Sequence, residues 1–336
     1  TVTPFSNNAT ICSYPDARSP NSIALECSLE QLDMFAGACG QGMSIEIPTG
    51  VGFCFYIRRE AIAKIGAFDV QTFKMGYGEE NDFCMRALKA GYRNLLACNV
   101  FVYHRGRVSF GSAKGIEATR ALNRKHPDYE PRIKAFLGAD PARVARVRLD
   151  LYRVAAAVRG RCVIIVTHGL GGGIETHTDW LVERLRQCQV NVVRMQTAGD
   201  ANVAIKSFMA DQSSIYIPSA QSLNVHRDFA VIKEFVGWSS PLFIHVHSLA
   251  GISGAAESRM IDLLLSIRIP MYFTAHDYRA ICHRNHLAFS DGSYCGMPRM
   301  ESCERCFESD VSCNDAMEPR ERRIKYGQLL EKCILI

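Results

Sequence analysis

The chain has 336 residues, of which 48% are hydrophobic and 22% are charged, and its formal net charge at pH 7 is +5. This balance is typical of a globular protein with room for two domains, and it excludes disordered chains, collagen-like chains and small disulfide scaffolds. No apolar run reaches the roughly 18 residues of a membrane-spanning helix, and the opening residues lack a signal-peptide pattern, so we expect a cytoplasmic protein.

The first part of the chain mixes loops with short elements. Apolar spacing and the positions of glycine and proline predict a buried strand over 51–57, a strand over 93–104, and helices within 24–37 and over 59–65, 79–90 and 115–125. Three carboxylates, Glu79, Glu80 and Asp82, stand at the start of the 79–90 helix. The helix dipole favours ionised carboxylates there, so they are candidates for a general base; simple charge complementarity to the helix end is the alternative.

The basic character of the chain belongs to one segment. Residues 120–161 contain eleven Lys and Arg against four Asp and Glu, a net +7, and the rest of the chain sums to −2. Asp140 and Pro141 predict the start of a helix that runs to about residue 158. Its apolar stripe consists of Val144, Val147, Leu151 and Val154.

Two interpretations of this basic helix stay open. The first is a linker helix over 136–160 that packs on its neighbours, and the second is a basic helix that makes peripheral contact with an anionic membrane surface. The segment lacks interleaved aromatic residues and any motif of a nucleic-acid-binding protein, so we expect no nucleic-acid partner.

From Cys162 onward, short β-branched runs alternate with amphipathic helices, which predicts parallel βαβ units in a Rossmann-like layer. A glycine-rich turn, Gly169 to Gly173, follows the first strand and can hold a phosphate on free backbone N–H groups; a tight turn that simply needs glycine is the alternative. Strands are predicted at 162–167, 190–195, 214–217, 242–247 and 271–275, and helices at 174–187, 229–236, 255–267 and 324–336. The last two strands end in His247 and His276-Asp277, at the edge where open α/β sheets bind ligands.

A cysteine cluster lies near the end of the chain. Cys282, Cys295, Cys303 and Cys306 form a C-x12-C-x7-C-x2-C pattern, with His283 and Cys313 nearby as spare ligands. The spacing predicts a structural Zn²⁺ site in an insertion at 282–313. Unpaired loop thiols, which are prone to oxidation, are the alternative.

The order of motifs in the first 125 residues resembles the acceptor-side half of the family 2 glycosyltransferases, which have the GT-A fold. The motifs are the glycine-rich run at 48–59, Gly66-Ala67-Phe68-Asp69, the run Glu79-Glu80-Asn81-Asp82, Ala90-Gly91-Tyr92 and Val102-Tyr103-His104. The resemblance implies an inverting sugar transfer in which Glu80 is the general base, where the family usually has Asp. It also implies that Asp82 orients the loop or binds the acceptor, and that His104 helps to hold a divalent Mg²⁺ or Mn²⁺.

The family's Asp-x-Asp metal motif does not occur in this chain. The resemblance therefore implies that the donor-binding half lies outside this sequence. Two further features, a first residue that is Thr and a last predicted helix without a cap, favour a fragment of a longer enzyme. We expect such a fragment to be inactive at the first site.

Residues 161–336 resemble the N-terminal Rossmann domain of the family 4 glycosyltransferases, which have the GT-B fold. The resemblance rests on the Gly-Gly-x-Glu turn and on the histidines that end the later strands. It implies that the donor phosphates lie beside Gly171, Gly172, Gly173 and Glu175. It also implies an acceptor cleft lined by His247, His276 and Asp277.

Together these features predict an α/β chain that is a fragment of a tandem glycosyltransferase of the hexosyltransferase type. A partial GT-A-like region at 1–135 is followed by the linker helix and by a GT-B-like domain at 161–336. The expected partners are a nucleotide-sugar donor and a glycan or lipid-linked acceptor, in bacterial-type synthesis of cell-surface polysaccharide at or near the inner face of the membrane. A non-catalytic sugar-binding or scaffold fragment is the alternative.

Overall fold

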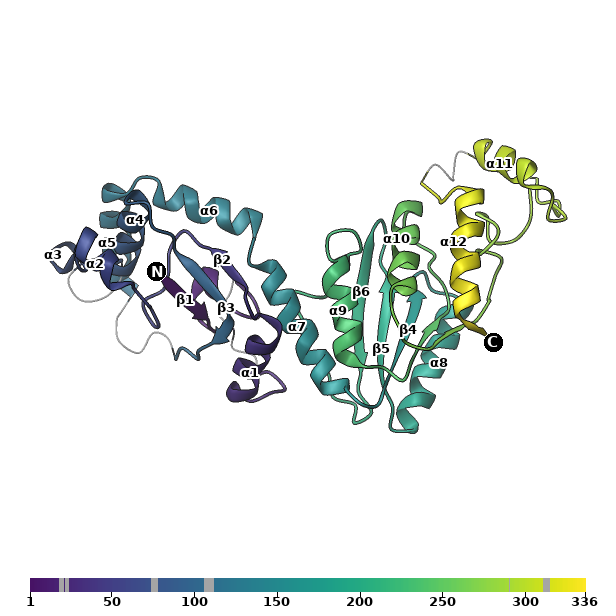
Figure 1. Cartoon of the computed structure of the whole chain (residues 1–336), viewed down its shortest axis with the longest axis horizontal. Coiled ribbons are helices and arrows are strands. Elements are labelled where there is room, and N and C mark those ends of the chain that lie inside the picture. The colour runs from purple at the N-terminus through teal and green to yellow at the C-terminus, as the bar shows by residue number, and fades with distance from the viewer. Residues whose placement is uncertain (18–20, 22–23, 74–77, 106–111, 290, 311–314) are drawn as a thin grey trace. The chain divides into compact units, whose positions relative to one another are not determined.

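The protein forms two compact units in the computed structural model (Figure 1). The structure describes residues 1–17, 21, 24–73, 78–105, 112–289, 291–310 and 315–336. Unit 1 contains Thr1–Arg153 and Tyr216–Ser219, and unit 2 contains Val154–Ile215 and Ala220–Ile336. The division falls inside one helix, α7 (Arg143–Val158).

Unit 1 is built on a three-stranded sheet with the strand order β1–β3–β2. β1 (Val2–Phe5) runs parallel to β3 (Leu95–Phe101), and β2 (Ser44–Glu46) is antiparallel to β3. The surrounding helices are η1 (Thr10–Cys12), α1 (Leu29–Cys39), α2 (Arg59–Ile65), α3 (Val70–Phe73), α4 (Glu79–Lys89), α5 (Ser112–Lys125) and α6 (Tyr129–Ala139).

The predicted strand over 51–57 is wrong. This segment forms turns, and Tyr56 makes an isolated antiparallel bridge to Val2. Its apolar side chains pack into the unit from a loop: the ring of Phe55 lies 6.4 Å from that of Phe68 and 6.4 Å from that of Phe83. The apolar run therefore predicted neither the strand nor its burial: every residue of 51–57 is at least partly exposed, and Tyr56 is 66% exposed.

Unit 2 is built on a seven-stranded, mostly parallel sheet with the order β10–β9–β8–β4–β5–β6–β7. The first five of these are parallel to one another, and β6 and β7 form an antiparallel edge. The strands are β4 (Cys162–His168), β5 (Asn191–Thr197), β6 (Asn202–Phe208), β7 (Leu223–Asn224), β8 (Phe243–Val246), β9 (Met271–Phe273) and β10 (Ile334–Leu335).

The helices of unit 2 are α8 (Gly173–Gln187), α9 (Phe229–Ser239), α10 (Gly254–Leu265), α11 (Met300–Glu308) and α12 (Pro319–Lys332). The central strand β4 is buried along its whole length, as expected for a parallel strand covered on both faces. Val163 and Ile165 of β4 pack with Val182 of α8, which fixes that helix over the sheet.

Several predictions in unit 2 are wrong. The predicted helix over 324–336 ends at Lys332, and the residues after it, Ile334–Leu335, form the edge strand β10. No strand was expected at β6, where a turn at Gly199 and Asp200, both with positive φ, sends the chain back as a hairpin. The predicted strand over 214–217 has no regular structure. The carbonyl of Tyr216 accepts a hydrogen bond from Arg153 at 3.1 Å, so this segment belongs to unit 1.

The basic helix α7 uses several of its arginines inside the fold. Arg153 is almost fully buried and forms ion pairs with Glu26 and with Asp150. Arg146 is also buried and pairs with Asp140. Of the predicted stripe, Val144 is exposed, and the buried members are Val147, Leu151 and Val154. No helix in the described part of the chain is long and apolar enough to span a membrane.

Candidate functional site

Five of the ten histidines of the chain gather at the carboxyl ends of the parallel strands of unit 2. Because parallel strands end at one edge of the sheet, residues far apart in sequence meet there. One of them comes from α8, and the others end or follow β4, β8 and β9. They are His168, His177, His245, His247 and His276.

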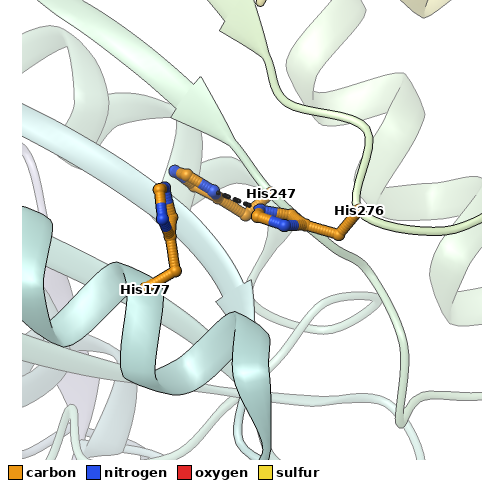
Figure 2. A group of neighbouring side chains, drawn as sticks. All are labelled: His177, His247 and His276. Carbon is orange, nitrogen blue, oxygen red and sulfur yellow. Dashed lines mark hydrogen bonds between the residues drawn. The ribbon is translucent and has the colours of Figure 1, made fainter.

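Three of these rings form a nearly equilateral triangle (Figure 2). The ring centroids are 5.5 Å apart for His177 and His247, and 5.2 Å apart for each of the other two pairs. Nδ1 of His247 and Nε2 of His276 are hydrogen-bonded at 2.9 Å. One ligand nitrogen from each ring lies within 4.8 Å of the other two. The three histidines therefore point their nitrogens into one small space, and we call them the histidine triangle.

His247 is the buried member of the histidine triangle, with only 3% of its surface exposed. Its ring lies 4.0 Å from that of His245, whose Nε2 is hydrogen-bonded to the Thr274 hydroxyl at 2.8 Å. Nε2 of His247 is buried and has no hydrogen-bond partner among the described residues. A buried polar atom without a partner costs about 1–3 kcal/mol, which favours a ligand at this position.

Burial favours the neutral form of several histidines at this edge. Burial, with repulsion from the neighbouring histidines, lowers the pKa of His247 to about 3 and that of His245 to about 4. Burial and the nearby His177 also lower the pKa of His276. Neutral imidazoles keep a lone pair, so these rings can accept hydrogen bonds or bind metal ions.

The glycine turn leads directly into the helix that carries His177. Gly171 and Gly172 have φ values of 81° and 83°, and Gly172 caps α8. A side chain built at Gly171, Gly172 or Gly173 would meet nothing within 4 Å, so the backbone here is open to a ligand. Glu175 is half-buried in the first turn of α8. The predicted phosphate role of these residues stays a prediction.

The residues expected to line an acceptor cleft, His247, His276 and Asp277, share one pocket with Ser248, Arg279 and Tyr326. Behind it lies Glu257, which is fully buried. Its carboxylate accepts hydrogen bonds from Arg279 at 2.7 Å, from Arg322 at 3.2 Å and from the Tyr326 hydroxyl at 2.6 Å. This network joins α10, the segment after β9 and α12 into the wall of the pocket.

Sequence reasoning missed His177 and the Glu257 network. A signal for His177 was present, because it lies four residues after Gly173 and so one helical turn into α8, on the helix that begins at the ligand edge of the sheet. The network of Glu257 had no local signal, because its partners follow it by 22, 65 and 69 residues.

In unit 1, Glu80 lies in the first turn of α4, and burial raises its pKa. The backbone N–H of Gly78 donates a hydrogen bond to its carboxylate at 3.2 Å, and Gly52 lies against its side chain. The next residue, Phe53, stacks on His104 with a ring separation of 4.9 Å. The loop at 52–53 therefore contacts both predicted site residues and brings them into one neighbourhood.

Glu79 and Asp82 have different surroundings. One carboxylate oxygen of Glu79 is buried and has no hydrogen-bond partner in the described part of the chain. Asp82 is fully buried and contacts Arg86 at 2.7 Å, Lys125 at 2.8 Å and His126 at 2.8 Å. Burial opposes its ionisation, but the hydrogen bonds from these three partners prevail, and the pKa of Asp82 is lowered. Its carboxylate is thus engaged within unit 1, where it ties α4 to α5.

The described residues of unit 1 do not by themselves complete a Mg²⁺ or Mn²⁺ site around His104, and the predicted metal role of His104 stays a prediction. Nδ1 of His104 lies 2.6 Å from the carbonyl oxygen of Asn8. The described residues of unit 1 contain no group of three His, Cys, Asp or Glu side chains whose ligand atoms all lie within 4.8 Å of one another.

The four predicted zinc ligands, Cys282, Cys295, Cys303 and Cys306, line a single pocket of unit 2. Arg323 donates a hydrogen bond to Sγ of Cys303 at 3.3 Å. Of the spare candidates, His283 is within 3.7 Å of Asp310, and Cys313 lies outside the described residues. No three of the four thiols, all of them described, meet the 4.8 Å limit that the histidine triangle meets. Zinc binding by these cysteines stays a prediction.

Comparison with known proteins leaves the family of this chain open. Neither a protein-family model nor a curated protein sequence matches it. The resemblance to two glycosyltransferase families rests on the motifs alone. The activity has to be inferred from the geometry of the two sites.

Proposed function

We propose that this chain is part of a tandem glycosyltransferase that transfers a sugar from a nucleotide-sugar donor to a glycan or lipid-linked acceptor. In this proposal unit 1 is a GT-A-like acceptor half, and unit 2 is a GT-B-like N-terminal domain. The observation that carries the proposal is the environment of Glu80. Its carboxylate stands at a helix start beside a glycine loop, with a raised pKa and with the stacked Phe53 and His104 close by.

A carboxylate in this setting suits a general base. Glu80 takes the proton from an acceptor hydroxyl, and the acceptor oxygen attacks the anomeric carbon of the donor sugar from the face opposite the leaving group. The bond from that carbon to the diphosphate oxygen breaks, the nucleoside diphosphate leaves with the bonding electrons, and the sugar configuration inverts. A raised pKa makes the carboxylate a stronger base nearer to neutral pH.

Unit 2 supports the same class of substrate. The open glycine turn at the start of α8 suits a diphosphate, because backbone N–H groups and the helix dipole favour anions there. The pocket of His247, His276 and Asp277 presents several hydrogen-bonding groups, which suits a sugar with many hydroxyls. The absence of Asp-x-Asp from the sequence favours a second candidate, in which this chain alone binds sugars without transfer.

The test is release of nucleoside diphosphate from a panel of nucleotide sugars by the gene product that contains this chain. Glu80→Gln removes the base but keeps the shape, and we expect the rate to fall by about 100-fold or more. The matched control is Glu46→Gln, at an exposed glutamate of β2 that pairs with Arg93 at 3.0 Å. An unchanged rate in Glu80→Gln, with the same melting temperature, would remove Glu80 from the mechanism. Tight sugar binding without any release would favour the second candidate.

A further inference from the structure

The geometry points to a transition-metal site at the histidine triangle: His177, His247 and His276 bind one Zn²⁺ ion, each through one ring nitrogen. This site is separate from the four-cysteine cluster, and it does not depend on the proposed sugar transfer. Each ligand comes from a different element, so the site exists only in folded unit 2.

The spacing of the rings suits one ion at their centre. Two nitrogens bound to a tetrahedral zinc ion at about 2.0–2.1 Å lie about 3.3 Å apart. The 2.9 Å between Nδ1 of His247 and Nε2 of His276 is close to that separation, and the nitrogen of His177 lies within 4.8 Å of both. His177 and His276 are the two exposed members, so their side chains are the ones that can rotate to close the ligand set around the ion.

The chemistry of the donor set selects the metal. Imidazole nitrogen suits Zn²⁺ and similar transition metals, whereas Mg²⁺ and Ca²⁺ prefer oxygen ligands. The charge of Asp277 also acts on His276, and that negative charge favours a bound cation.

The rigid member of the site is His247. It is buried, and the hydrogen-bonded pair of His245 and Thr274 stands against its ring. A buried, packed ligand with two exposed partners is a partly preformed site, since less side-chain freedom is lost on binding. Three protein ligands leave a fourth zinc position for water or an anionic oxygen. His247 and His276 line a pocket with Ser248 and Arg279, and the glycine turn precedes His177 by one turn of α8.

The test measures metal binding directly. The chain is stripped with a chelator, and the variant Cys303→Ser/Cys306→Ser is used as background so that the cysteine cluster does not contribute. Titration with Co²⁺ should show one ion per chain, with the visible bands of nitrogen and oxygen ligands and no thiolate charge-transfer band. Zn²⁺ should displace the cobalt and abolish the spectrum.

In that background, His177→Ala and His276→Ala should each weaken Co²⁺ binding by about 100-fold or more, because one of three protein ligands is lost. Both residues are exposed, so we expect the variants to fold, which their circular dichroism checks. The matched control is His226→Ala, at an exposed histidine of the same unit, which should bind Co²⁺ as the background does. The proposal is overturned if the background binds no Co²⁺, or if both His177→Ala and His276→Ala bind it with unchanged affinity.

Discussion

His247 and His276 are separated by 29 residues in the chain, yet their rings share a hydrogen bond of 2.9 Å between Nδ1 and Nε2. In that bond one neutral ring donates and the other accepts. The donating ring therefore keeps a free lone pair on its other nitrogen. The consecutive parallel strands β8 and β9 deliver the two rings to one edge of the sheet.

Zinc should stabilise folded unit 2, because a ligand that binds only the native state raises the free energy of unfolding. At a free Zn²⁺ concentration of about 100 times its Kd, the expected gain is about 2.7 kcal/mol. Thermal unfolding of Cys303→Ser/Cys306→Ser, with and without Zn²⁺, measures it. In the same background His276→Ala should show no such gain at that Zn²⁺ concentration, and an equal gain would place the zinc elsewhere.

The four-cysteine cluster makes a separate prediction about metal content. If its thiols close on an ion, the purified chain contains zinc that His276→Ala retains and that Cys303→Ser loses, about one ion per chain. Elemental analysis of both variants after gel filtration measures this. An equal zinc content in Cys303→Ser and in wild type would show that the cysteines of the cluster do not bind zinc. They would then be free thiols, which an alkylating reagent should label.

The rate of the proposed sugar transfer should fall at acid pH because Glu80 becomes protonated. We call this part of the pH–rate profile the acid limb. A general base works only when deprotonated, and burial raises the pKa of this carboxyl above its usual value. The rate should therefore be lost as the pH falls through that raised pKa, at a higher pH than an ordinary glutamate would give. The pH–rate profile of nucleoside diphosphate release measures this. Glu80→Asp, which places there the residue usual in the family that the motifs resemble, should keep activity and shift the limb, and an unshifted limb would contradict the assignment.

Asp82 should be a stability residue of unit 1. Asp82→Asn leaves Arg86, Lys125 and His126 without their shared carboxylate, and breaking a buried ion pair costs about 3–5 kcal/mol. Urea unfolding measures the loss. The matched control is Asp128→Asn, whose exposed pair with Arg132 is worth less than about 1 kcal/mol. Equal effects of the two variants would contradict the network.

The same carboxylate sets an acid limit for unit 1. The pKa of Asp82 is lower in the folded state than its usual value of 3.8. Its stabilising contribution is therefore complete above the unfolded pKa and is lost as the pH falls below about 4 through the folded pKa. Unfolding free energies measured between pH 6 and 2.5 should fall less steeply over this range in Asp82→Asn than in wild type.

The glycine turn can be tested by a single methyl group. Gly172 has φ 83° and ψ −164°, a conformation open almost only to glycine, so Gly172→Ala should cost about 1–3 kcal/mol or distort the start of α8. Affinity for a nucleoside diphosphate, measured by calorimetry, should fall with it. The control Gly237→Ala, inside α9 with open space around it, should instead stabilise by about 0.5–1 kcal/mol. Unchanged affinity in Gly172→Ala would separate the turn from phosphate binding.

Local patterns predicted the elements that carry the site better than they predicted the site itself. The β4 strand, the glycine turn and α8 could be read from one continuous segment, because an apolar run, glycines and a helical period are local signals. The histidine triangle could not be predicted in this way, because whether its three rings meet depends on which strands are neighbours in the sheet. His247 and His276 were expected in one cleft. His177 could not be predicted to join them without knowing that α8 lies over that edge of the sheet.

Two errors have related physical causes. Residues 51–57 are apolar because Phe55 packs against Phe68 and Phe83, and a loop can do this as well as a strand. Residues 214–217 were interpreted through the expected βαβ repeat, but the carbonyl of Tyr216 bonds to Arg153, and the backbone N–H of Ser219 bonds to Asp150 at 2.8 Å. In both cases tertiary contacts of distant residues decided the backbone.

The Glu257 network has a consequence for the cysteine-rich insertion. Arg279 and Arg322 both bind the carboxylate of Glu257, and Arg322 also donates a hydrogen bond to the carbonyl of Arg279 at 3.1 Å, across 43 residues of sequence. The two arginines that flank the insertion are therefore held at one buried carboxylate. Closing a flexible loop becomes only about 0.6 kcal/mol harder when its length doubles. A change of length within the predicted cysteine insertion is therefore expected to leave the Glu257 network in place.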